Sequence, residues 1–75
     1  MIEKEKLEKI RAHMPSGSYA KIANETGFSE AYVSMVMRGE RPVNASNIKI
    51  VKSAIRQVEV KAKELNKIID KISKL

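Results

Sequence analysis

Cysteine and tryptophan are absent from the 75-residue chain, and phenylalanine occurs once. Without cysteine, disulfides and thiolate metal sites are excluded. His13 is the only histidine and has no carboxylate cluster at ligand spacing, so we expect neither a metal site nor a cofactor. No apolar run exceeds three residues, far short of the roughly 20 that cross a bilayer. No apolar segment typical of a secretion signal opens the chain, so we expect a cytoplasmic protein with no membrane partner.

Positive charge is concentrated in the second half of the chain. Fifteen Lys and Arg residues against nine Asp and Glu give a net charge of +6. Residues 1–37 carry five of each sign, whereas residues 38–75 carry ten basic and four acidic residues. A basic half favours a polyanionic partner, nucleic acid first and an anionic membrane second. The membrane is the weaker of these because residues 44–75 contain no Trp, Phe or Tyr.

Prolines and glycines divide this small single domain into four expected helices, and no segment alternates as a strand would. The first helix ends before Pro15, the second lies between the N-cap Ser18 and Gly27, and the third lies between the N-cap Ser29 and Gly39. The fourth is unusually long because nothing after residue 44 breaks it. The expected ranges are residues 2–13, 19–26 and 30–37, and a last helix capped by Asn44 that runs to residue 75. The sequence therefore predicts an all-α fold.

The second and third expected helices form a helix-turn-helix. We expect Ala20, Ile22 and Ala23 to be buried, with Ala23 at the crossing of the two helices, where a larger side chain would separate them. Residues 19–39, YAKIANETGFSEAYVSMVMRG, resemble the helix-turn-helix of the phage repressor and Cro family, the lambda-repressor-like regulators. The resemblance implies a DNA-binding domain whose second motif helix enters the major groove. The alternative is a plain helical bundle whose short helices meet at a glycine turn.

Candidate DNA contacts lie on the third helix and on the segments around it. With residues 33, 36 and 37 facing inward, Ala31 and Met35 are free to pack on thymine methyl groups, and Arg38 suits guanine or a phosphate. Phosphate contacts are expected at the starts of the second and fourth helices and after the third. The predicted DNA-binding residues are Ser18, Tyr19, Lys21, Ser29, Glu30, Ala31, Tyr32, Ser34, Met35, Arg38, Arg41, Asn44, Ser46 and Lys49.

Apolar residues recur at spacings of 3 and 4 from Ile48 to Ile72, which is a heptad pattern. Its first part is expected to pack on the protein's own helices, and the rest extends beyond anything so small a globule can cover. We therefore predict a helix-turn-helix domain at residues 1–58 and a coiled-coil dimerisation segment at 59–75. The alternative is a bend near Asn66 that folds the helix back. The predicted dimerisation residues are Val58, Ala62, Leu65, Ile69 and Ile72.

These patterns together predict a sequence-specific, double-stranded DNA-binding transcriptional regulator of the repressor or Cro kind, bacterial or phage in origin. It would act as a homodimer on half-sites about 34 Å apart, controlled by its own concentration or by a regulatory protein partner. The alternative is a helical protein–protein assembly module, phage-encoded for instance, that uses the long helix and reads no DNA. No motif indicates an enzyme, since the two S-x-x-K matches lack their companion motifs.

Overall fold

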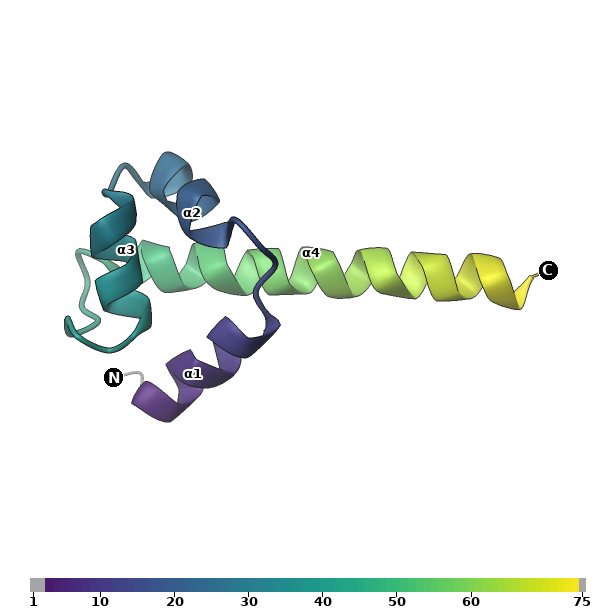
Figure 1. Cartoon of the computed structure of the whole chain (residues 1–75), viewed down its shortest axis with the longest axis horizontal. Helices are drawn as coiled ribbons and strands as arrows, with labels where there is room; N and C mark the ends of the chain where they lie inside the picture. Colours follow the sequence, from purple (N-terminus) through teal and green to yellow (C-terminus); the bar gives the residue numbers. More distant parts are fainter. Residues whose placement is uncertain (1–2, 75) are drawn as a thin grey trace.

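Four α-helices make up the computed structural model, which describes residues 3–74 (Figure 1). They are α1 (Lys4–His13), α2 (Ser18–Thr26), α3 (Glu30–Met37) and α4 (Ile48–Ser73). No strand occurs between residues 3 and 74, so the all-α class is confirmed. Over the same residues, none of the helices combines the length and the apolar character that crossing a membrane requires.

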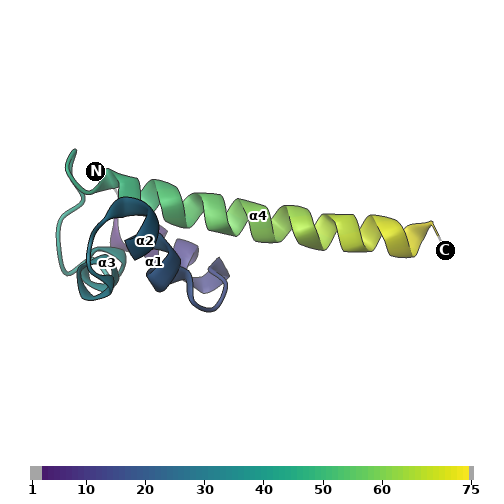
Figure 2. The ribbon, with the colours of Figure 1, turned by 90° about the horizontal axis from the view of Figure 1, so that it is seen from above.

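Three short helices pack on one side of one end of α4, and the other end projects away from them (Figures 1 and 2). We call residues 3–58 the head and residues 59–74 the tail. Gln57 and Val58 are half-buried, whereas every residue of the tail is exposed. The expected alternative, a bend near Asn66, is wrong, because α4 is one helix of 26 residues through that position. More than half of α4 therefore contributes nothing to the buried core of residues 3–74.

The core of the head combines one face of each helix. α3 contributes Val33, Val36 and Met37, and α4 contributes residues 50, 51 and 54. Burying one aliphatic side chain stabilises a fold by about 1.5–3 kcal/mol. A core with so few side chains therefore gives only a small net free energy of unfolding. The buried apolar residues are Leu7, Ile22, Val33, Val36, Met37, Val43, Ile50, Val51 and Ala54.

Left-handed glycines end both helices of the central motif. Gly27 has φ +83° and Gly39 has φ +79°, as their predicted places after α2 and α3 require. After α3, the N–H of Gly39 donates to the Val36 carbonyl at 3.1 Å, and the N–H of Glu40 donates to the Met35 carbonyl at 2.9 Å. This pair of bonds is the Schellman motif. It reverses the chain at the end of α3.

The start of α2 differs from the prediction. Ser18 is the first helical residue and does not cap the helix; its hydroxyl donates to the Pro15 carbonyl at 2.6 Å, and left-handed Gly17 takes the cap position. Ala20 was expected in the core but is exposed, because Ile22 and half-buried Ala23 carry the inward face of α2.

The fourth helix begins at Ile48, three residues later than a helix capped by Asn44 would. The side-chain oxygen of Asn44 accepts the N–H groups of Ser46 at 2.9 Å and Asn47 at 3.2 Å. Asn44 therefore caps a turn that precedes the helix. Asparagine side chains commonly bond nearby backbone N–H groups in this way and so compete with helix formation. The prediction that Asn44 caps the fourth helix is therefore wrong, because Asn47 takes the cap position.

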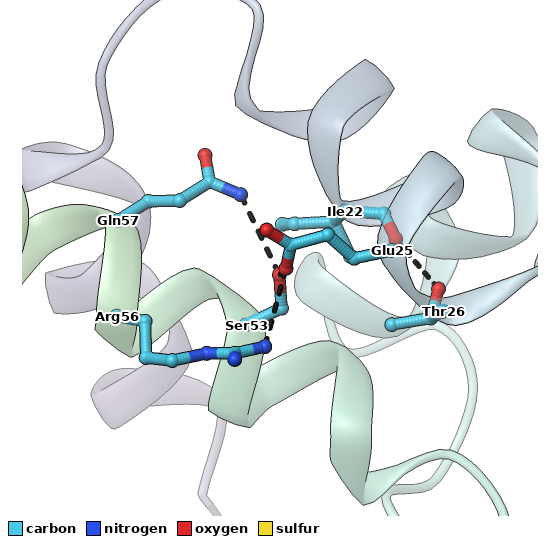
Figure 3. Close-up of polar contacts among 6 residues, drawn as sticks. All are labelled: Ile22, Glu25, Thr26, Ser53, Arg56 and Gln57. Carbon is cyan, nitrogen blue, oxygen red and sulfur yellow. Dashed lines mark hydrogen bonds and ion pairs between the residues drawn. The ribbon is translucent and has the colours of Figure 1, made fainter.

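A polar cluster joins α2 to α4 near the boundary of the tail (Figure 3). The Glu25 carboxylate accepts a hydrogen bond from the buried Ser53 hydroxyl. It also forms an ion pair with Arg56, whose Nη2 lies 3.2 Å from Glu25 Oε2. The Gln57 amide nitrogen lies 3.5 Å from the same hydroxyl, and its oxygen is buried without a partner among residues 3–74. Because Glu25 and Ser53 come from different helices, these bonds fix how α2 crosses α4.

Candidate nucleic-acid interface

One side of α3 is left uncovered by the fold. Val33, Val36 and Met37 are fully buried, as predicted. On the opposite side Glu30, Ala31 and Arg38 are exposed and Ser34 and Met35 are half-buried. Both views place α3 at the end of the molecule away from the tail (Figures 1 and 2). The helix thus presents a mixed apolar and polar stripe at an accessible end of the head.

The guanidinium of Arg38 already has an anionic partner. Its Nε lies 2.8 Å from a Glu40 carboxylate oxygen, and both side chains are more than half exposed. An ion pair this exposed contributes about 0–1 kcal/mol, so it can be replaced by a stronger anion. Arg41 follows on the same connector, is exposed, and forms no ion pair within residues 3–74.

A buried asparagine, which the sequence reasoning missed, joins α3 to the start of α4. Asn47 is 1% exposed. Its oxygen accepts the Asn44 N–H at 2.8 Å, and its nitrogen donates to the Pro42 carbonyl at 2.9 Å and to the Tyr32 hydroxyl at 3.1 Å. Because these bonds span α3, the connector and α4, Asn47 is a positioning residue for the whole end of the head.

Tyr32 therefore has a structural role that was not predicted. Its ring stacks on Phe28 with centroids 5.0 Å apart, and Lys49 Nζ lies 5.2 Å from the centroid of the Phe28 ring. The Tyr32 oxygen accepts from Asn47, so the phenol hydrogen is still available to a ligand. The stack holds the cation of Lys49 beside the N-terminus of α3. Ser29 caps that end, accepting the Tyr32 N–H at 3.1 Å, as predicted.

The residues predicted at the start of α2 do not form one site. Ser18 is 3% exposed with its hydroxyl already donating, so its side chain is not available to a phosphate. Tyr19 is half-buried against the core. Lys21 lines a hollow with Glu25, Arg56 and residues of the tail, which groups it with the α2–α4 junction and not with the α3 stripe.

The start of α4 offers fewer free N–H groups than expected. Those of Asn47 and Ile48 both bond to the Asn44 carbonyl, and that of Ile50 bonds to the Asn47 carbonyl. The Ser46 N–H is taken by the Asn44 side chain. An anion here would therefore meet the exposed side chains of Ser46 and Lys49 rather than an open helix end.

Arg11 is a second residue that sequence reasoning did not single out. From α1 it donates to the carbonyl of Met37, at the end of α3. The two residues are 26 positions apart, so no local pattern indicates the contact. Together with Asn47 at the other side, Arg11 fixes α3 in the head.

No family model matches the chain, and no curated protein or solved structure matches it. The resemblance to the lambda-repressor-like regulators therefore rests on the sequence alone, chiefly on residues 19–39. Within residues 3–74 no three His, Asp or Glu side chains come together as a metal site would require.

Proposed function

We propose that the protein is a sequence-specific, double-stranded DNA-binding regulator of transcription, acting in the cytoplasm of a bacterial cell, with α3 in the major groove. The observation that carries the proposal is the uncovered stripe of α3. Val33, Val36 and Met37 are buried and Tyr32 stacks on Phe28, whereas Glu30, Ala31, Ser34 and Met35 lie on the other side of the helix at an accessible end of the head. The resemblance to the lambda-repressor-like helix-turn-helix agrees with this use.

Each part of the surface has a chemical counterpart in a duplex. Ala31 and Met35 suit thymine methyl groups, Ser34 can donate or accept, and Arg38 suits guanine. Arg41 and Lys49 lie outside α3, on the connector and at the start of α4, and suit phosphates. The side chain of Ser18 and the helix end at Ile48 are left out of the proposal because their hydrogen-bonding groups are already used.

Binding is tested by fluorescence anisotropy on random-sequence duplexes at several salt concentrations, followed by selection of the preferred sequence. With about three to five phosphates neutralised per subunit, each subunit bound to a duplex contributes roughly −3 to −4.5 to the log–log salt slope. Arg41→Ala should flatten the slope by about one per subunit. Lys67→Ala, which removes the same charge from the tail, should leave it nearly unchanged. A wild-type slope near zero would rule out nucleic acid as the partner.

Base reading by α3 is tested by placing a charge on its exposed first turn. Ala31→Asp should abolish selection of the preferred sequence, because a carboxylate would face base edges and phosphates. A negative side chain in the first turn of a helix interacts favourably with the helix dipole, so circular dichroism should show no loss of helix. Arg38→Ala should cost about 1–3 kcal/mol of affinity if the side chain pairs with guanine. Unchanged binding by both variants would remove α3 from the interface.

The Arg38–Glu40 pair gives an opposite and independent test. Glu40→Gln removes the anion that competes with DNA for Arg38 and also lowers repulsion from phosphates. Affinity should therefore rise, whereas Glu64→Gln in the tail, which removes the same charge, should change it little. Weaker binding by Glu40→Gln would mean that Glu40 itself accepts from a base.

A second candidate function is favoured by the tail. Its large apolar residues are half or more exposed, which suits a helical protein–protein assembly module that reads no DNA. The two functions separate in the anisotropy experiment, because an assembly module retains its self-association or partner binding when no duplex binds.

A further inference from the structure

The apolar face of the tail continues the buried face of the head. Val51, Val58, Leu65 and Ile72 lie at intervals of seven residues, close to two full turns, so they form one line along α4. Val51 is 1% exposed and Val58 half-buried, whereas Leu65 and Ile72 are 57% and 62% exposed. The same line is thus covered by the head at one end and uncovered at the other.

The head restricts what can cover the rest of this line. α1 packs against α4, leaving a hollow of about 240 Å³ lined by Ile10, Ile55, Val58 and neighbouring residues. The hollow has room for a side chain but not for a helix about 10 Å across. A second copy running parallel would place its own α4 beside Val58, where Ile10 of α1 already lies. A straight parallel pair through this face is therefore blocked.

We propose that two copies of the chain pair antiparallel through their tails, each tail ending just before the other copy's head. In this register Leu65 packs against Ile69 of the second copy, and Ala62 packs against Ile72. Each contact occurs twice because the pair has two-fold symmetry. Ile68, outside the predicted heptad residues and 55% exposed, lies beside its own counterpart near the symmetry axis. This register therefore gives Ile68 an apolar contact, which the heptad pattern does not predict.

The charges of the tail are complementary to themselves in the same register. The tail contains five lysines and three acidic residues. Each of the three acids lies within one residue of the level of a lysine of the second copy, on the same flank of the pair. These pairs are Glu59 with Lys74, Glu64 with Lys71, and Asp70 with Lys63. The flanks of the pair therefore bring opposite charges near each other on either side of the apolar seam.

The arrangement places the two heads at opposite ends of the dimer. The two copies of Ile50 lie about 50 Å apart along the helix axis, at a rise of 1.5 Å per residue. Because α3 lies at the end of each chain away from the tail, the two α3 surfaces face outward (Figures 1 and 2). The separation of about 34 Å expected for adjacent half-sites does not fit this geometry. If the proposed function holds, on which this consequence rests, one dimer joins two separate DNA segments.

Engineered cysteines test the pairing, since the natural chain has none. Residues 62 and 72 are about 15 Å apart within one helix, too far for an internal disulfide, which needs Cβ atoms about 4 Å apart. On mild oxidation of the full chain at high micromolar concentration, Ala62→Cys/Ile72→Cys should form a reducible dimer. Ile72→Cys alone and the control Lys67→Cys, on the polar side of the tail, should remain monomeric on denaturing gels.

Each other outcome overturns the proposal. A dimer of the single variant Ile72→Cys would mean parallel chains or an antiparallel register centred on residue 72, and both contradict the proposed register. Efficient cross-linking of Ile55→Cys/Ile72→Cys would mean a register shifted by one heptad into the hollow beside α1. A wild-type monomer in sedimentation equilibrium, with no cross-link in any variant, would mean that the tail's partner is not a second copy.

The DNA consequence is measured separately, by capture of a labelled duplex on an immobilised duplex of the selected sequence. Wild-type protein should join the two duplexes, whereas Leu65→Asp should bind a single duplex and fail to join them, because it buries an unpaired charge in the seam. Cross-links without any DNA binding would refute the proposed function and leave the pairing intact. Cross-links with single-duplex binding but no joining would refute the outward placement of α3.

Discussion

The head and the tail share one helix but differ in what their apolar side chains contact. Val51 in the head and Leu65 in the tail lie on one line of α4, yet the first is 1% exposed and the second 57%. Both satisfy the same periodicity, and only the head supplies other helices to cover it. The difference shows that a spacing of 3 and 4 identifies an apolar face without identifying what packs on it.

Asn47, the N-cap of α4, and Asn66, inside α4, differ in the same way. Asn47 is buried and bonded to three groups of the head, whereas Asn66 is exposed in the tail. An amide can be buried only where its hydrogen bonds are satisfied, and the connector after α3 supplies the partners. The tail offers none, so Asn66 remains on its surface.

The largest expected effect separates two leucines. Leu7, 2% exposed, packs α1 on the core, so Leu7→Ala should lower the free energy of unfolding by about 2–5 kcal/mol, enough to unfold much of so small a domain. Leu65→Ala should change it by no more than about 0.5 kcal/mol at concentrations where the chain is monomeric. Urea denaturation followed by circular dichroism measures both. Equal losses in the dilute protein would mean that the tail packs on the head.

A smaller effect separates the two asparagines. Asn47→Ala leaves the Tyr32 hydroxyl, the Pro42 carbonyl and the Asn44 N–H without their partner, so it should destabilise the head by about 1–3 kcal/mol. Asn66→Ala removes an exposed side chain, so the stability of the monomer should stay the same or rise. DNA affinity should fall with Asn47→Ala beyond the loss of folded protein, because the start of α4 moves relative to α3. Equal stability of the two variants would show that the buried network contributes nothing net.

Local signals in the sequence predicted the features that depend on neighbouring residues. The bounds of α3 matched because Ser29 and Gly39 act within a few residues of the helix they delimit. The inward face of α3 followed from periodicity, and the unbroken course of α4 followed from the lack of glycine and proline, although its start was not predicted. Each of these depends on residues within one or two turns, which is the range over which a sequence pattern carries information.

Features that join distant segments could not be predicted. Arg11 meets Met37 from 26 positions away, and Ser53 meets Glu25 from 28. Ser18 matched the composition of an N-cap, but Gly17 was free to adopt the left-handed conformation and turned the hydroxyl back to Pro15. Which predicted cations share a surface with α3 depends on how the helices cross, and the separation of Lys21 from that surface follows from the packing of α2 on α4.

The smallest expected effect tests whether the tail folds independently of the head. Lys67→Gly places a residue of poor helix propensity, costing about 1 kcal/mol relative to alanine, in the polar side of the tail. An isolated helix as short as the tail is marginal in water, so a glycine there should unwind several residues. In dilute monomeric protein the ellipticity at 222 nm should fall, while the urea midpoint of the head stays unchanged, since no tail residue is buried.

Lys67→Ala is the matched control and should raise the ellipticity slightly. At concentrations where two copies pair, the antiparallel contact through Ile68 holds this part of the tail, so the loss of ellipticity should shrink. A loss that stays the same at all concentrations, or a midpoint that falls with it, would contradict the division of α4 into a packed head and an independent tail.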